Sequence, residues 1–153
     1  MKHIIYNDGV KKNIYDLNYD ISYQITYIEY IFNDISFQYD NYIHNELKKK
    51  YSSYKQQDKL KHKFNPDLHI SYKEMIKKLY ESNLKCYYCN CSVCIIYNKK
   101  KAHNQWSLER LNNNIGHYND NTRISCLRCN LQRRTDNHEY FKYSKQFKIN
   151  RIE

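Results

Sequence analysis

Hydrophobic and polar residues alternate along the N-terminal part of the chain, and a second periodicity runs through the same positions. Between residues 15 and 27 every odd position is Tyr, Leu or Ile and every even position is polar, which is typical of a half-buried strand. Leu, Ile and Phe also recur at spacings of three and four from Leu17 to Ile35, which is typical of an amphipathic helix. Together the patterns predict a strand over residues 15–23 and a helix that begins near Thr26.

The next two segments carry helical signals alone. Residues 39–60 contain no Pro or Gly and are rich in Lys, so we expect a helix that ends before Pro66. Ser71 and Glu74 have the spacing of a capping box, and apolar residues follow them at helical intervals. This pattern predicts a short helix over residues 71–82.

The second half of the chain combines short apolar runs with polar loops. The run at residues 93–97 predicts a buried strand. Residues 106–111 and 123–125 are candidate strands of a hairpin, connected through a loop over residues 112–117. A helix is expected to begin near Cys126.

That C-terminal helix should carry Asn130 and Arg134 on one side, because the two residues are four positions apart. The tail over residues 141–152 is expected to be a last packed segment. The order strand, loop, strand, helix predicts an α+β domain in residues 71–153. Residues 1–70 should form a mixed, largely helical N-terminal extension that is rich in Lys in its second half.

Six cysteines occur among 153 residues, and four of them form Cys-x-x-Cys pairs at 86–89 and 126–129. Such a turn presents two thiolates to one metal ion, so two turns complete a closed tetrahedral zinc site. A pair at 91–94 has the same spacing and competes with the first. Zinc on four thiolates can contribute roughly 10–16 kcal/mol to folding, and we expect this zinc to be structural.

The cellular compartment follows from the cysteines and from the hydropathy. The chain begins with a polar segment, and no apolar run approaches the roughly 20 residues that a membrane span requires. Thiolates that are kept as metal ligands indicate a reducing compartment. We therefore expect a soluble intracellular protein of the cytoplasm or nucleus that is not secreted.

The formal net charge of +10 is unevenly distributed. Residues 1–47 carry three Lys and seven acidic residues, whereas residues 48–101 carry fourteen Lys and four acidic residues. The abundance of Lys, Asn, Ile and Tyr is typical of A/T-rich genomes, such as those of some viruses, and explains part of this basicity. Four arginines near the second cysteine pair could hold phosphates, which favours a nucleic acid as partner. They are Arg123, Arg128, Arg133 and Arg134.

Several motifs occur in a fixed order within residues 71–140. They are Cys86-Tyr87-Tyr88-Cys89, Trp106-Ser107-Leu108-Glu109-Arg110-Leu111-Asn112-Asn113, Gly116-His117, Asn121 and Cys126-Leu127-Arg128-Cys129-Asn130. In this order they resemble the HNH endonucleases of the ββα-metal type, and more narrowly the four-cysteine subgroup that includes the phage Holliday-junction-resolving endonuclease. The resemblance implies a zinc-stapled, treble-clef-like ββα-metal core.

The resemblance also bears on the choice of zinc ligands. The family places its first cysteine pair directly after a short helix, which favours the pair at 86–89 over the pair at 91–94. The implied zinc ligands are Cys86, Cys89, Cys126 and Cys129. Cys91 and Cys94 are then expected to be small hydrophobic residues.

The resemblance implies roles for three further residues. Glu109 corresponds to the carboxylate, usually Asp, and Asn130 to the helix residue that together hold a catalytic Mg²⁺ or Mn²⁺. Asn121 corresponds to an Asn that holds the hairpin loop in shape. A hard cation of this kind takes oxygen ligands and stabilises the attacking and leaving oxygens of a phosphodiester.

Arg110 replaces the family's general-base histidine in this chain. A guanidinium group stays protonated at physiological pH and cannot take a proton from water, so Arg110 is expected to clamp the scissile phosphate. Either water is activated without a protein base, or a histidine elsewhere is the acceptor. The candidates are His117, His103 and His138.

These features favour a metal-dependent endonuclease that acts on duplex or branched DNA. A homodimer fits this function, because double-strand cleavage by one metal site per chain requires two copies or two turnovers. The alternative is an HNH-fold nucleic-acid-binding module that lacks catalysis because its histidine is missing. A zinc ribbon in a transcription complex would use the cysteines alone and leave Glu109 and Asn130 unexplained.

Overall fold

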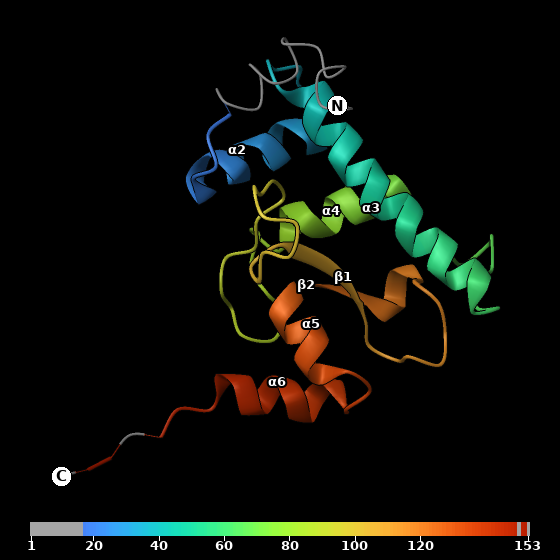
Figure 1. The fold of residues 1–153 in the computed structure, drawn as a ribbon, viewed down its shortest axis with the longest axis vertical. Helices are drawn as coiled ribbons and strands as arrows, with labels where there is room; N and C mark the ends of the chain where they lie inside the picture. Colours follow the sequence, from blue (N-terminus) through green and yellow to red (C-terminus); the bar gives the residue numbers. More distant parts are fainter. Residues whose placement is uncertain (1–16, 150, 153) are drawn as a thin grey trace, which may run out of the picture.

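The computed structural model describes residues 17–149 and 151–152, and its α+β architecture confirms the predicted class (Figure 1). In the view of Figure 1, helices α2, α3 and α4 lie above a two-stranded sheet and helix α6 lies below it. The elements are, in chain order, α2 (Ile21–Phe32), α3 (Asp40–Leu60), α4 (Tyr72–Glu81), β1 (Trp106–Arg110), the 3₁₀ helix η2 (Asn119–Asn121), β2 (Thr122–Cys126), α5 (Leu127–Arg133) and α6 (His138–Gln146).

Helix α2 replaces the C-terminal part of the strand that was predicted over residues 15–23, so that prediction is wrong where the structure describes it. Residues 15 and 16 lie outside the described range. The side chain of Asp20 caps the helix by accepting a hydrogen bond from the Ser22 N–H at 3.4 Å. The segment is helical rather than extended because a helix buries one continuous face of it. This face consists of Gln24, Tyr27, Ile28 and Ile31.

The helices predicted over residues 39–60 and 71–82 are confirmed. Helix α3 covers the segment predicted at 39–60, and it buries Ile43 and Leu47 on its inner face. Helix α4 begins with the expected capping box, in which the Ser71 hydroxyl accepts from the Glu74 N–H at 3.1 Å. The Glu74 carboxylate in turn accepts from the Ser71 N–H at 2.9 Å.

The strand predicted at residues 93–97 is wrong, although Val93, Ile95 and Ile96 are buried as expected. The side chain of Gln24 takes the hydrogen bonds that a neighbouring strand would supply. Its Oε1 accepts from the N–H groups of Ile95 at 2.7 Å and Ile96 at 3.2 Å, and its Nε2 donates to the Ile96 carbonyl at 3.3 Å. This buried amide therefore supplies the partners of residues 95 and 96, whereas the N–H groups of Val93 and Cys94 donate to backbone carbonyls, each at 2.8 Å, without forming a strand.

The predicted hairpin is confirmed as the antiparallel pair β1 and β2, with Trp106 opposite Cys126 and Arg110 opposite Thr122. Helix α5 follows directly, and the Cys126 sulfur accepts from the Cys129 N–H at 3.4 Å as its N-cap. The helix ends at Arg133, because Arg134 adopts a positive φ of 54°.

The packed tail predicted over residues 141–152 is a helix only up to Gln146, and none of the residues of α6 is fully buried. Its main contact with the core is the ring of Phe141, which packs edge-on against the buried Tyr88 ring at 4.9 Å between centroids. Trp106 is also a core residue, with 1% of its surface exposed. Within the described residues no helix combines the length and apolarity needed to cross a membrane.

Gln24 offers a test of this packing. Replacing it by Leu keeps the volume but leaves two buried N–H groups without partners, so we expect the free energy of unfolding to fall by about 2–4 kcal/mol. Urea denaturation of Gln24→Leu measures this. Gln56→Leu, on the exposed face of α3, is the matched control and should change stability by less than about 0.5 kcal/mol. Equal effects of the two substitutions would contradict the role assigned to Gln24.

Candidate functional site

Four thiols converge where the turn after α4 meets the junction of β2 and α5. The ligand atoms of Cys86, Cys89, Cys126 and Cys129 all lie within 4.8 Å of one another. The first turn is closed by hydrogen bonds from the Cys86 N–H to the Cys91 carbonyl at 2.8 Å and from the Asn90 N–H to the Cys86 carbonyl at 3.0 Å. The cluster could hold a zinc ion, and it uses the first of the two competing cysteine pairs.

Cys91 and Cys94 lie outside this cluster and are half-buried. The Cys94 sulfur accepts a hydrogen bond from the Asn104 Nδ2 at 3.2 Å, and Cys91 contributes its carbonyl to the turn. The position of Cys94 is consistent with the expected role of a small packing residue, whereas the Cys91 thiol also interacts with the cluster thiols of Cys89 and Cys126.

Two of the four clustered thiols, those of Cys86 and Cys129, resist ionisation in the absence of a cation. A hydrogen bond with Cys126, together with burial, raises the pKa of Cys86 to about 12. Burial and the neighbouring Cys86 raise the pKa of Cys129 to about 12. Four thiolates at this spacing would repel one another, and a doubly charged ion that binds sulfur would offset this repulsion.

A polar pocket of about 250 Å³ lies between β1, α5 and the C-terminal end of α3. It brings together the four residues that sequence analysis assigned to catalysis and one of the arginines assigned to phosphate binding. They are Glu109, Arg110, His117, Asn130 and Arg134. His103 and His138 are not among its lining residues.

Glu109 is buried, with 4% of its surface exposed, and its two carboxylate oxygens differ. Oε1 accepts a hydrogen bond from Arg133 Nη1 at 2.7 Å, whereas the buried Oε2 has no hydrogen-bond partner among the described residues. Burial raises the pKa of Glu109 to about 7, although the positive charge of Arg133 opposes this shift. The unpaired Oε2 is thus a strong acceptor for a cation or a proton.

Asn130 reaches the same pocket from helix α5. Its Nδ2 donates to the hydroxyl of Ser107 at 2.5 Å, and this orients the side-chain amide. This bond uses the amide nitrogen, so Oδ1 is the atom of Asn130 that could bind a cation. Because Ser107 and Glu109 are two positions apart on β1, their side chains share one face of the strand, and Asn130 lies over that face.

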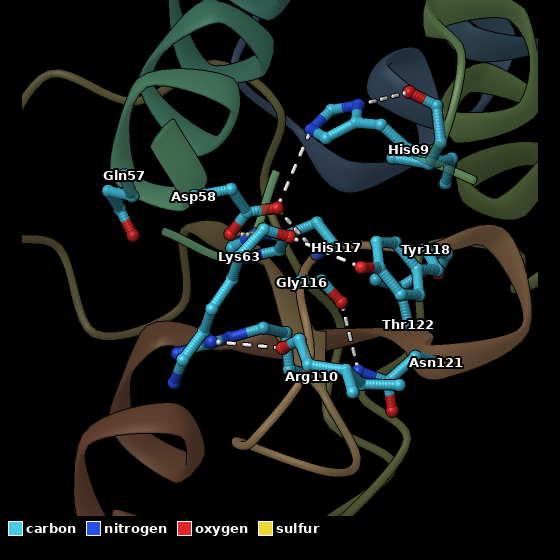
Figure 2. Close-up of polar contacts among 12 residues, drawn as sticks. Gln57, Asp58, Lys63, His69, Arg110, Gly116, His117, Tyr118, Asn121 and Thr122 are labelled. Carbon is cyan, nitrogen blue, oxygen red and sulfur yellow. Dashed lines mark hydrogen bonds and ion pairs between the residues drawn. The ribbon is translucent and has the colours of Figure 1, made fainter. Parts of the chain in front are cut away.

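His117 is held by Asp58, a residue that sequence analysis did not single out (Figure 2). Asp58 lies near the end of α3 and is fully buried. Its Oδ1 pairs with His117 Nδ1 at 2.8 Å, and its Oδ2 accepts from the His117 backbone N–H at 2.6 Å. If Nδ1 carries the proton that Asp58 accepts, the Nε2 of His117 is left as a proton acceptor.

Burial lowers the pKa of His117 to about 4, in spite of the opposite effect of the Asp58 carboxylate. The imidazole is therefore neutral at physiological pH and can accept a proton. Gly116 allows this close approach, because a Cβ at that position would lie 2.6 Å from Asp58 Oδ2 and 2.5 Å from the Lys63 carbonyl oxygen.

The loop that carries His117 is fixed by Asn121. The Asn121 Nδ2 donates to the carbonyls of Asn112 and Gly116, each at 3.0 Å, and its Oδ1 accepts from the Asn112 N–H at 2.9 Å. Arg110 Nη1 donates to the carbonyls of Asn113 at 3.3 Å and Ile115 at 3.2 Å. These two hydrogen bonds hold the same loop against the end of β1.

The structure separates the four arginines that were expected to hold phosphates. Arg133 is buried, and its guanidinium donates to Glu109 and to the carbonyls of Arg110, Leu111 and Asp136, so it is not available to a phosphate. This burial corrects the prediction for Arg133. The other three are at least partly accessible and lie at three places: Arg134 at the polar pocket, Arg128 beside the Cys89 thiol, and Arg123 at the outer edge of β2.

No model of a known protein family matches the chain, and no solved structure matches it. The chain is similar to a protein of Acanthamoeba polyphaga mimivirus described as uncharacterized protein R423, with 38% identity over 69 residues. The matched region is 45% of the chain but only 11% of the mimivirus protein. Part of the chain therefore has a viral relative.

Proposed function

We propose that the protein is a metal-dependent endonuclease of the HNH type that hydrolyses phosphodiester bonds in DNA. The observation that carries this proposal is the polar pocket in which Glu109, Asn130 and His117 meet. They come from a strand, a helix and a loop, respectively, so their convergence is a property of the fold rather than of one short motif. Arg110 and Arg134 at the same pocket supply positive charge for the phosphate.

The four-cysteine cluster holds a zinc ion that is structural in this proposal. Four sulfur ligands complete the tetrahedral shell of zinc and leave no position for water or substrate. The ion would fix the first turn of α5 against β2, and Asn130 directly follows the last ligand, Cys129. Zinc thus positions the pocket and does not enter the reaction.

Glu109 Oε2 and Asn130 Oδ1 would hold the catalytic Mg²⁺ or Mn²⁺. Both are oxygen donors of the kind that hard cations prefer, and the unpaired, buried Oε2 of Glu109 fits a cation ligand. When bound, the cation stabilises negative charge on the attacking and leaving oxygens of the phosphodiester. Arg133, on the other oxygen of Glu109, holds the carboxylate in place.

His117 takes the role of the missing general base. Its Nε2 accepts the proton of the attacking water, while Asp58 holds Nδ1 and stabilises the imidazolium that forms. Asp58 is a positioning residue, because it acts through His117. Arg110 and Arg134 contact the phosphate and neutralise the charge that develops on it.

The Glu109–Arg133 ion pair favours a second candidate function, that of a nucleic-acid-binding module without catalysis. At 2.7 Å this pair already compensates the charge of the carboxylate, which would reduce its affinity for a cation. In that case Arg110 and Arg134 bind phosphate and no bond is cleaved. The two candidates differ in whether DNA is cut when Mg²⁺ or Mn²⁺ is present.

The zinc assignment predicts one zinc ion per chain. Cys129→Ser should reduce the zinc content of the purified protein to near zero and lower the free energy of unfolding by several kcal/mol. Cys94→Ser is the matched control and should keep one zinc ion, because Cys94 lies outside the cluster. Elemental analysis and thermal denaturation measure both quantities. Full zinc content in Cys129→Ser would refute the assignment.

Metal-dependent nicking of supercoiled plasmid tests the proposed function. Zinc-loaded protein should nick the plasmid when Mg²⁺ or Mn²⁺ is added, and Asn130→Ala should be slower by about 100-fold or more, because it loses a cation ligand. Gel electrophoresis of the plasmid gives the rates, and zinc content gives the folding control. DNA binding without nicking on plasmid and on branched DNA would favour the binding module.

The assignment of the base predicts a difference among the histidines. His117→Gln should lower the nicking rate by about 100-fold while DNA affinity is unchanged, because the proton acceptor is lost while the new side-chain amide can still donate to Asp58. His103→Gln, at an exposed position away from the pocket, should keep the wild-type rate. Since the pKa of His117 is lowered to about 4, its loss should have the same effect at about pH 6 and about pH 8. A variant His117→Gln with normal activity would exclude His117 as the base.

A further inference from the structure

A second pocket, of about 440 Å³, lies at the outer edge of β2 and is lined by cationic side chains from four separate elements. Helix α4 contributes Lys78, the first cysteine turn contributes Lys85, strand β2 contributes Arg123, and helix α6 contributes Lys142. These side chains are far apart in the sequence, and the fold brings them to one cavity. We refer to it as the basic pocket.

The cations of the basic pocket are held by uncharged groups. Lys78 Nζ and Arg123 Nη1 both donate to the Thr122 carbonyl, at 3.1 and 2.8 Å, and Lys85 Nζ donates to the Ser92 hydroxyl at 3.3 Å. Among the residues that the structure describes, none of the four cations forms an ion pair with a carboxylate. Four cationic side chains thus line the pocket, against one carboxylate, that of Glu81, and one thiol, that of Cys86, which the zinc assignment makes a thiolate ligand.

Glu81 is the one carboxylic acid that lines the basic pocket, and its charge offsets only part of the positive charge there. Its carboxylate also pairs with Lys77, on the exposed face of α4, at 3.8 Å. Lys78 and Arg123 share a carbonyl and repel each other, which lowers the pKa of Lys78 in addition to the larger effect of burial, while the nearby carboxylates of Glu74, Glu81 and Asp120 oppose this shift. An anion in the pocket would relieve this repulsion.

The ring of Tyr87 fixes two of the cations. Lys142 Nζ lies 4.0 Å from the ring centroid, and the guanidinium carbon of Arg123 lies 5.8 Å from it. The Tyr87 N–H donates to the Ile124 carbonyl at 2.8 Å, so the ring is anchored to the edge of β2. The cations are thereby pre-organised without loss of charge, and this lowers the entropy cost of binding an anion.

The basic pocket is distinct from the polar pocket of Glu109, since the two share no lining residue. The two pockets nevertheless lie beside adjacent strands, because Glu109 on β1 is directly opposite Arg123 on β2. Residues directly opposite each other in an antiparallel pair have Cβ atoms about 4.5–5.5 Å apart. A nucleic-acid backbone that passes the hairpin could therefore reach both pockets.

We propose that the basic pocket binds phosphodiester groups of the nucleic acid that flank the site of reaction. The pocket offers ammonium and guanidinium donors to an anion, and it is assembled from four elements of the fold. The proposal rests on the proposed function for the identity of the polymer as DNA. The site supplies affinity and orientation rather than base recognition, because contacts to phosphate carry no sequence information directly.

The test measures the salt dependence of DNA binding by the full, zinc-loaded chain without Mg²⁺ or Mn²⁺. A fluorescein-labelled duplex oligonucleotide is titrated at several NaCl concentrations with wild type, Lys85→Gln/Lys142→Gln and Lys73→Gln/Lys148→Gln. The control pair removes the same charge from exposed lysines that do not line the pocket. Zinc content and thermal denaturation confirm that all three proteins are folded.

Lys85→Gln/Lys142→Gln should bind more weakly, and the slope of log affinity against log salt should be smaller by about 1.8, since each phosphate contact contributes about 0.9. The control pair should keep the wild-type slope. Equal slopes in the two double variants would overturn the proposal, and so would a wild type that does not bind duplex DNA.

Measuring both the salt slope and DNA nicking with the same proteins tests this proposal and the proposed function separately. A slope that depends on the pocket, in a protein that never nicks DNA, would support the basic pocket and contradict the nuclease. Nicking that persists with no change of slope in Lys85→Gln/Lys142→Gln would support the nuclease and overturn the basic pocket.

Discussion

The meeting of four sulfur atoms within 4.8 Å is the constraint on which the arrangement of the C-terminal half depends. It joins the turn after α4 to the start of α5, although the two cysteine pairs are well separated in sequence. Because Cys126 ends β2 and caps α5, the same contact sets the angle at which the helix leaves the hairpin. Asn130, one position after Cys129, is thereby carried over the face of β1 that bears Ser107 and Glu109.

Buried polar contacts then complete the site in a chain with a small hydrophobic core. Asp58 links α3 to His117, Arg133 links α5 to Glu109, and Gln24 links α2 to the loop at residues 95–96. Each contact satisfies groups that would be costly to bury alone, and each joins segments far apart in the sequence. The N-terminal helices therefore do more than cover the core, since α3 supplies the carboxylate that orients the proposed base.

Sequence patterns predicted the elements whose signals are local. The capping box at Ser71, the Pro-free lysine-rich segment and the hairpin before Cys126 all led to the correct element, because their determinants lie within a few residues. The strand predicted at 15–23 failed because alternation and helical spacing coincide there, and burial of the helical face decided between them. The strand predicted at 93–97 failed because the backbone of residues 95 and 96 bonds to the distant side chain of Gln24, which no local pattern shows.

The same distinction applies to the site. The family resemblance implied that Glu109 and Asn130 act together, and it left His117 as one of three candidate histidines. The roles of Asp58 and Arg133 depend on contacts between distant elements. Asp58 continues the helical spacing of Leu47 and Tyr54 on the inner face of α3, and this spacing is the signal that could have identified it. Arg133 resembles its exposed neighbours in sequence, and only the structure shows that it is buried.

Anomalous diffraction from crystals of the zinc-loaded protein grown with Mn²⁺ tests the central claim most directly. We expect one zinc peak among the four sulfurs and a separate manganese peak about 2.0–2.4 Å from Glu109 Oε2 and Asn130 Oδ1. The manganese peak should disappear in crystals of Asn130→Ala. A pocket that stays free of manganese while Arg133 keeps its contact with Glu109, or a manganese ion bound elsewhere in a protein that cuts DNA, would contradict the account.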